Sequence, residues 1–293
     1  MKKMLITVLL VIVVMSVFPM TASADTDPKQ SVVVDFAGLE GQNYLVTLLS
    51  ESPAAGPNLA FGYLGEDEGE ELTGIEKIFD DYEDPDGFYF LRFFEDCSET
   101  NRFEWGYYPP RTFKVLLYFP ETGSFLCSDK SFERYAFDSY FTAHISDLNL
   151  AAEAQSAGII VVKKSYPYAT EILALIVRII ITLVIEIGIA LLFGFRERKQ
   201  LKLILITNIV TQISLNLLLN YVNYNSGPLM FKIFYFLLEL AVFAAEAINY
   251  VVCLNKISKE EVPRGLAVKY ALVANAASFF IGYGLSQYIP EFF

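Results

Sequence analysis

The stretch ATEILALIVRIIITLVIEIGIALLFGFRERK, residues 169–199, indicates the class of this protein. A transmembrane helix needs about 20 mostly apolar residues, and residues 171–193 supply that length before a basic cluster begins at Arg196. Three later segments have the same character, so the sequence predicts four membrane-spanning helices. We place the four spans near residues 171–193, 201–221, 229–254 and 266–288.

Charge divides the chain at the same place. Residues 25–168 contain 26 acidic and 10 basic side chains, for a net charge of −16, whereas residues 169–293 contain 8 acidic and 10 basic side chains, for +2. The first part is therefore an acidic polar domain, and the second part is a transmembrane domain that contacts the lipid bilayer. The net negative charge of the acidic domain would repel the phosphate backbone of a nucleic acid, so we expect no nucleic acid partner.

Residues 1–24 have the three parts of a secretory signal peptide: Lys2 and Lys3, an apolar run, and a small-residue cleavage site at Ala22-Ser23-Ala24. The alternative is an uncleaved anchor, but the apolar run is short for a span. Basic loops stay in the cytoplasm, and they follow the first and third predicted spans. Both signals predict a multi-pass protein of the cell membrane whose N-terminal domain and C-terminus are extracytoplasmic.

Residues 25–168 are predicted to form a β-rich extracytoplasmic domain. Runs rich in Val, Tyr, Phe and Leu, bounded by Gly, Pro, Asp or Ser, are typical of strands. Such runs occupy residues 32–36, 44–49, 88–94, 112–119 and 140–145. Residues 74–82 carry apolar side chains at helical spacing. We therefore expect a β-sandwich with one short helix, followed by an all-α bundle of four transmembrane helices.

Two stretches of this domain are candidates for a binding role. Trp105, Tyr107 and Tyr108 precede two prolines, and aromatic rings beside rigid prolines can form a platform for a sugar or a peptide. The alternative is that these rings fill the core of the sandwich. The acidic residues 66–71 and 80–86 match a calcium-binding loop only in part, so a solvated acidic loop is expected there and no metal site.

Cys97 and Cys127 are both predicted to lie outside the cytoplasm, where a disulfide can persist. A bond between these two residues would stabilise the domain by about 3–4 kcal/mol on the chain-entropy model, and we expect them to pair. Cys253 lies near the end of the third predicted span and is expected to be a free thiol.

Polar side chains recur on one face of each of the first three predicted spans. The first span carries Arg178 and Glu186, and the third carries Glu239 and Glu246. The second span carries a polar residue at every fourth position: Asn208, Gln212, Asn216 and Asn220. Counting along the helices brings Arg178 near Glu239, where they could form an ion pair, and Glu186 to the depth of Glu246.

Two carboxyl groups at one depth should not both be ionised. Either one of them carries a proton, or a cation lies between them, with Asn208 as a further ligand. There are two alternatives. The polar residues can serve only to hold the helices together, or they can form a surface for the helix of a partner protein.

Sequence motifs for catalysis are absent. The single histidine, His144, lies in the predicted extracytoplasmic domain, which excludes zinc motifs that need two histidines. No nucleophile elbow or P-loop pattern occurs. We expect this protein not to be an enzyme and to use no cofactor.

Several stretches carry a resemblance to a known family. They are DPDGFYFL (84–91), WGYYPP (105–110), FKVLLYFP (113–120), RYAFDSY (134–140), EIGIALLFG (186–194) and NIVTQ (208–212). With these stretches the chain resembles a family of exported multi-span membrane proteins of Firmicutes, mainly clostridial, that has no assigned activity. The resemblance covers nearly the whole chain from Ser31 onward and implies the same architecture without assigning a reaction.

Three functions fit this organisation. The first is a cell-surface binding or sensing domain that acts with a membrane or cell-surface partner protein, since the predicted cytoplasmic loops are short. The second is a small proton or cation transport or channel component that uses the buried carboxyl groups. The third is a structural subunit of an envelope complex. Four spans are few for an independent transporter, which favours the first. The short link over residues 161–167 predicts that the exterior domain packs close to the membrane.

Overall fold

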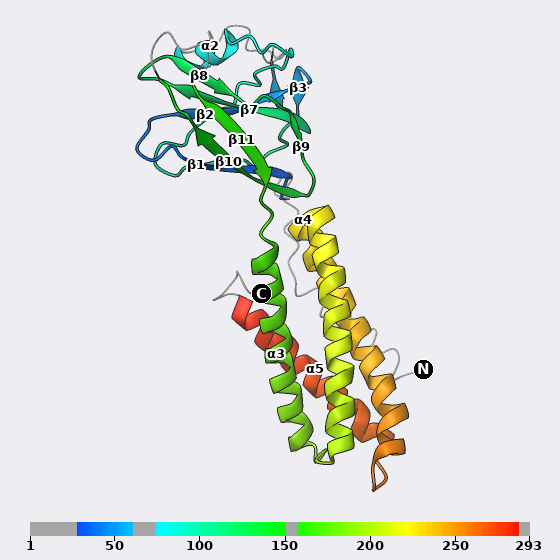
Figure 1. Ribbon diagram of the computed structural model, residues 1–293. Helices are drawn as coiled ribbons and strands as arrows, with labels where there is room; N and C mark the ends of the chain where they lie inside the picture. Colours follow the sequence, from blue (N-terminus) through cyan, green and yellow to red (C-terminus); the bar gives the residue numbers. More distant parts are fainter. Residues whose placement is uncertain (1–27, 61–73, 151–156, 287–293) are drawn as a thin grey trace.

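The computed structural model describes residues 28–60, 74–150 and 157–286. These residues form an N-terminal β domain followed by long apolar helices (Figure 1). The predicted signal peptide and the acidic stretch 66–71 lie outside the described residues.

The described part of the β domain contains two main sheets. The first has the strand order β11-β10-β1-β6, and the second has the order β5-β2-β7-β8, with β9 also paired to β7; β3 and β4 form a small hairpin. The strands are β1 Ser31–Ala37, β2 Leu45–Ser50, β3 Ala54–Ala55, β4 Asn58–Leu59, β5 Glu95–Asp96, β6 Arg102–Trp105, β7 Thr112–Phe119, β8 Ser124–Cys127, β9 Phe132–Glu133, β10 Asp138–Ser146 and β11 Ile159–Lys164. The pairing of β1 with β10 is parallel.

The main core lies between the two sheets, where alternate side chains of the strands meet. Val34 of β1 and Phe141 of β10 face Leu48 of β2 and Val115 of β7. The other face of the second sheet is covered by α2 (Gly74–Asp80), whose Phe79 is fully buried against Leu116 and its neighbours. Because β7 is covered on both faces, its sequence is almost continuously apolar rather than alternating.

Four of the five predicted strands are confirmed, as is the short helix at Gly74–Asp80. The prediction of a strand at residues 88–94 is wrong, because only a single bridge joins Tyr89 to Ser50. Arg92 has a left-handed backbone (φ 54°), which breaks the extended run. The rings of Phe90 and Phe94 pack instead on Phe79, with ring centroids 5.3 and 5.5 Å away.

The described helices of the second half are α3 (Tyr168–Leu192), α4 (Arg198–Ile257) and α5 (Arg264–Ser286). Each of these three is long and apolar enough to cross a membrane. The 60-residue α4 folds back on itself at Gly227, which has φ 78° and precedes Pro228. The described part of the second half therefore has four helical segments, as predicted. Residues 222–228, which separate the second and third predicted spans, are helical except at Gly227.

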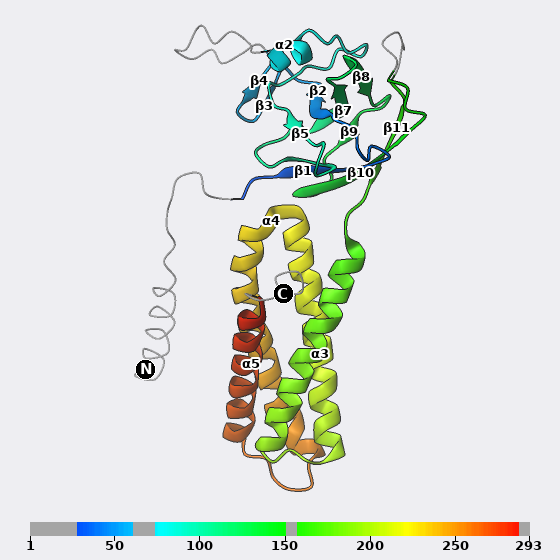
Figure 2. The same cartoon turned by 90° about the vertical axis from the view of Figure 1, so that its left-hand side faces the viewer.

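Hydrogen bonds across α4 show that its two arms run antiparallel. Asn249 donates to Thr207 at 2.7 Å, and Gln200, near the start of the first arm, donates to Ser258 at 2.8 Å. The turn at Gly227 lies beside the β domain, while the links 193–197 and 258–263 lie at the opposite end of the helices (Figure 2). Both predicted basic clusters therefore lie at the end remote from the β domain.

Candidate functional site

The β domain rests directly on the turn of α4. The amide of Phe137 donates to the carbonyl oxygen of Tyr224 at 2.8 Å. A methyl group placed on Gly227 would lie only 2.5 Å from the Phe137 ring. Only glycine therefore gives both the backbone conformation of the turn and room for the ring of the β domain. The short link thus holds the β domain against the helices, while its closeness to the membrane stays a prediction.

Tyrosine rings complete this contact. Tyr166, in the link between β11 and α3, packs edge-on against Tyr224 at a centroid distance of 5.2 Å. The ring centroids of Tyr135 and Tyr224 are 6.3 Å apart. The Tyr135 hydroxyl donates a hydrogen bond to the carbonyl oxygen of Tyr140 at 2.7 Å. Tyr166 donates to the Glu171 carboxylate at 2.7 Å. Two effects raise the pKa of Tyr166: its burial, which is the larger, and this hydrogen bond. The contact between the β domain and the helices thus combines packed aromatic rings with defined hydrogen bonds.

The second candidate site is the polar core of the helices. Glu186 of α3 and Glu246 of α4 are both fully buried. Glu246 accepts hydrogen bonds from Thr211 at 2.6 Å and from Asn275 of α5 at 2.7 Å. All four helical segments therefore contribute to one polar layer around the two predicted carboxyl groups.

Glu186 is less well satisfied than Glu246. Ser278 donates to its Oε1 at 3.4 Å, whereas its Oε2 has no hydrogen-bond partner. Asn208 interacts with this carboxyl group. Its amide nitrogen donates to Ile204 and to Tyr250, whereas its Oδ1 has no partner. Each of these two buried oxygens therefore lacks a hydrogen-bond partner. A proton on Glu186 or a bound cation would supply what the carboxyl group lacks.

The other predicted polar residues form a second layer, nearer the β domain. Arg178 donates to the Asn216 side chain at 3.0 Å, and Asn216 donates to the backbone carbonyl of Gln212 at 2.9 Å. Glu239 lies beside Tyr235. The guanidinium of Arg178 has other interactions besides its hydrogen bond to Asn216, and its expected ion pair with Glu239 stays a prediction.

Sequence reasoning missed two members of the polar core. Thr211 donates to Glu246 and follows Asn208 by three residues, on the same helical face. Tyr250 accepts a hydrogen bond from Asn208 and follows Glu246 by four residues. Both could have been found by extending the predicted polar faces to hydroxyl side chains.

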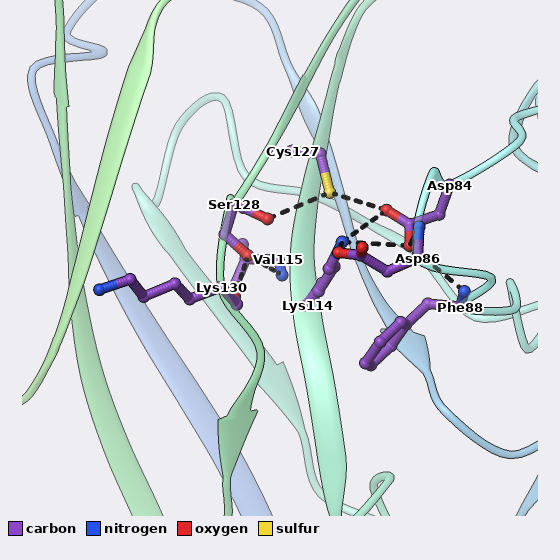
Figure 3. A network of polar contacts seen from close by, with 8 residues as sticks. All are labelled: Asp84, Asp86, Phe88, Lys114, Val115, Cys127, Ser128 and Lys130. Carbon is purple, nitrogen blue, oxygen red and sulfur yellow. Dashed lines mark hydrogen bonds and ion pairs between the residues drawn. The ribbon is translucent and has the colours of Figure 1, made fainter.

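A buried ion pair in the β domain was also missed. Lys114 of β7 is only 4% exposed, and its ammonium group donates to both oxygens of Asp84, at 3.0 and 3.1 Å, and to Asp86 (Figure 3). Burial disfavours the charge of Lys114, but the hydrogen bonds to Asp86 and Asp84 outweigh burial and raise its pKa. The two carboxylates that partly match a calcium loop are thus occupied by a lysine. Among the described residues no cluster of metal-ligating side chains occurs.

Cys97 and Cys127 are free thiols, so the predicted disulfide is wrong. Cys97 follows β5 and Cys127 ends β8, and these strands lie at opposite edges of the second sheet with β2 and β7 between them. Three strand spacings separate them by roughly 14 Å, which is about twice the longest Cα separation that a disulfide can bridge. Cys127 instead donates to Asp84 at 3.8 Å (Figure 3).

The predicted aromatic surface is correct only in part. Trp105 is 2% exposed and belongs to the core, where its ring lies 4.7 Å from that of Phe93. It is therefore excluded from the binding surface, and the alternative of a core residue is correct for it. Tyr107 and Tyr108 are 39% and 42% exposed and remain at the surface.

Comparison of the chain with protein-family models, with curated proteins and with solved structures finds no match. The resemblance to exported membrane proteins of Firmicutes therefore stays a prediction, and the function has to follow from the geometry of the molecule.

Proposed function

We propose that this protein is a membrane-bound sensor whose extracytoplasmic β domain transmits binding events to its helices and acts with a membrane or cell-surface partner protein. The observation that carries the proposal is the contact of Phe137 with Tyr224 and Gly227. A domain attached only by a linker would need no fitted contact at the turn of α4, whereas a sensor requires one element that both parts of the molecule touch.

Because there is no free space between Phe137 and Gly227, a movement of one of these residues toward the other has to displace it. A displacement of the Phe137 ring toward the helices meets backbone directly. The turn of α4 is continuous with the arms that carry Thr211 and Glu246. A shift at the turn can therefore reach the polar core through rigid helix.

The coupling is tested by unfolding the full-length protein in mild detergent. Trp105, the only tryptophan, reports the β domain by its fluorescence, and helical circular dichroism reports the helices. The two transitions should coincide in the wild type and separate in Phe137→Ala, because coincident transitions require coupled unfolding. Tyr107→Ala, at an exposed ring outside the contact, is the matched control. Transitions that are already separate in the wild type would contradict the proposal.

The partner is tested by determining the mass of the intact complex purified from its own membranes. A second membrane protein in stoichiometric amount supports either a sensor or a structural subunit of an envelope complex. Phe137→Ala separates the two, because a purely structural subunit should still assemble with its partner and perform its role in this variant. A monomer or homo-oligomer argues against both roles.

A proton or cation transport component is the second candidate function. It is favoured by the unpartnered oxygens of Glu186 and Asn208 in the polar core. Proton and cation flux into vesicles containing the purified protein tests it, with Glu261→Gln, at an exposed carboxyl group in the link 258–263, as the control. Flux that is lost in Glu186→Gln and kept in the control would support this function.

A further inference from the structure

A cavity in the β domain lies between the β3–β4 hairpin and the start of β7. Its volume is about 240 Å³, below the range of about 300–1,000 Å³ that is usual for drug-sized ligands. The ring of Tyr108 and the backbone of Gly56 form one wall, and Arg111 and Arg134 form another. The cavity therefore suits a small ligand.

Two positive charges meet in this cavity within a strongly acidic domain. The amide of Arg134 donates to the carbonyl oxygen of Arg111 at 2.9 Å, which holds the two arginines side by side. Burial, and then the charge of Arg111, lower the pKa of Arg134. A bound negative charge would relieve this repulsion.

The hydrogen-bonding capacity of Arg134 is only partly used. Its Nη1 donates to the side chain of Gln30, whereas its Nε is buried and has no partner. A buried donor without an acceptor is unfavourable, so this group marks a place where an acceptor is missing. Planar guanidinium groups pair preferentially with carboxylate and phosphate oxygens.

The wall of the cavity is also held under strain. Tyr108 has a left-handed backbone (φ 51°), which is uncommon for a bulky residue. It packs so closely on the β3–β4 hairpin that a methyl group on Gly56 would lie 2.2 Å from its Cβ. Strained residues of this kind gather at binding sites, where the surrounding structure holds them in place.

We propose that this cavity binds a small oxyanion, a carboxylate or a phosphate, between Arg111 and Arg134. Glu51, whose side chain is exposed, also lines the cavity. Its negative charge opposes the ligand and limits the affinity. Tyr108, retained from the predicted aromatic surface, also lines the cavity.

The position of Arg134 links this cavity to the helices. Only the four residues 134–137 connect β9 to β10, and they carry Arg134 at one end and Phe137 at the other. Ser139 accepts hydrogen bonds from the amides of Tyr135 and Ala136, at 3.0 and 3.1 Å, which stiffens this segment. An oxyanion that draws Arg134 into the cavity therefore shifts Phe137 against the turn of α4. This last step rests on the proposed function, whereas binding rests on the cavity alone.

Binding is tested by calorimetry on the full-length protein in phosphatidylcholine nanodiscs, with phosphate and succinate as separate probes at constant ionic strength. Binding of phosphate alone identifies a phosphate group as the natural ligand chemistry, and binding of succinate alone identifies a carboxylate. Arg111→Gln and Arg134→Gln should each weaken binding about tenfold or more, since each removes hydrogen bonds between charged groups. Absence of binding by both probes to the wild type overturns the proposal.

Two further variants control this result. Arg102→Gln removes an exposed arginine whose partner is Asp35, outside the cavity, and should leave affinity unchanged. An equal loss of affinity in this variant would reveal non-specific attraction and overturn the site. Glu51→Gln should strengthen binding, and a misfolded variant cannot produce a gain. Unchanged or weaker binding in Glu51→Gln would also contradict the proposal.

The link to the helices has a separate readout. Saturating anion should alter hydrogen exchange of residues 222–228 in the wild type. Phe137→Ala should keep the affinity for the anion and lose that change. Anion binding with no change in wild-type exchange would refute the coupling while leaving the site intact.

Discussion

The β domain and the helical half each bury ionisable side chains, which is unfavourable unless partners compensate them. The two regions provide this compensation in opposite ways. In the β domain Lys114 lies between Asp84 and Asp86, so opposite charges compensate one another. In the helices two carboxyl groups, Glu186 and Glu246, share a core in which their hydrogen-bond donors are the neutral side chains of Thr211, Asn275 and Ser278. The first arrangement is complete without a ligand. The second lacks one hydrogen at Glu186, and this makes the helical core the part open to a proton or a cation.

Removal of the lysine should have the largest effect. Lys114→Met leaves Asp84 buried without its counter-charge, and breaking a buried pair in this way typically costs about 3–5 kcal/mol. Denaturant unfolding followed by Trp105 fluorescence measures the loss in the β domain. Lys130→Met, at an exposed lysine whose side chain points away from the network (Figure 3), should be nearly neutral. A loss below about 1 kcal/mol in Lys114→Met would show that the pair behaves like a surface salt bridge.

Glu246→Gln should have an intermediate effect. Both oxygens of Glu246 accept hydrogen bonds from donors, and an amide can accept at only one of its two ends. The amide nitrogen would have to donate to Thr211, whose hydroxyl can also accept. Two hydrogen bonds to a charged group would thus become neutral ones, which costs about 1–2 kcal/mol. Thermal unfolding of the helices, followed by circular dichroism in detergent, measures this cost against Glu239→Gln. An unchanged stability would mean that Glu246 already carries a proton.

Glu186→Gln should cost less than about 1 kcal/mol, because the carboxyl group has only the long hydrogen bond from Ser278, at 3.4 Å, to lose and its Oε2 has no partner. Infrared spectroscopy gives an independent readout, since a protonated carboxyl has its own carbonyl band. That band should disappear in Glu186→Gln and persist in Glu246→Gln. If it persists in both, Glu186 does not carry the proton.

The smallest effect concerns the thiol beside the lysine pair. Burial, and then interactions that include the nearby Asp84, raise the pKa of Cys127 to about 11, and burial raises that of Cys97 to about 12. Both thiols are therefore protonated at pH 8 and should resist iodoacetamide in the folded protein, because the thiolate is the nucleophile. In denaturant without reductant all three cysteines should react. If Cys97 and Cys127 do not react with iodoacetamide in denaturant, they form the predicted disulfide after all.

The sequence predicted the helical half more fully than the β domain, and for a physical reason. An apolar span of fixed length is a local property of the sequence. Asn208, Gln212 and Asn216 are four residues apart, and this spacing places them on one helical face. The depth argument correctly brought Glu186 and Glu246 into one layer. It did not resolve which donors reach them, because that depends on helix rotation.

In the β domain the errors came from long-range pairing. Cys97 and Cys127 are separated by strand order, which no local pattern records. Lys114 stands in a run of apolar residues and meets Asp84 only after the turn at residues 84–88 folds onto β7. Trp105 has the composition of a surface platform, yet strand alternation turns it inward. In each case tertiary contacts decided the outcome.

The parallel pairing of β1 with β10 has a kinetic consequence. Ser31 and Asp138, which begin the two strands, are 107 residues apart. The first sheet therefore cannot close until β10 has been synthesised. Contacts over such long separations slow folding, so until β10 is available β1 can pair only with β6 and leaves its other edge open. Factors that shield an emerging strand should therefore influence the yield of this protein more than the stability of its finished fold.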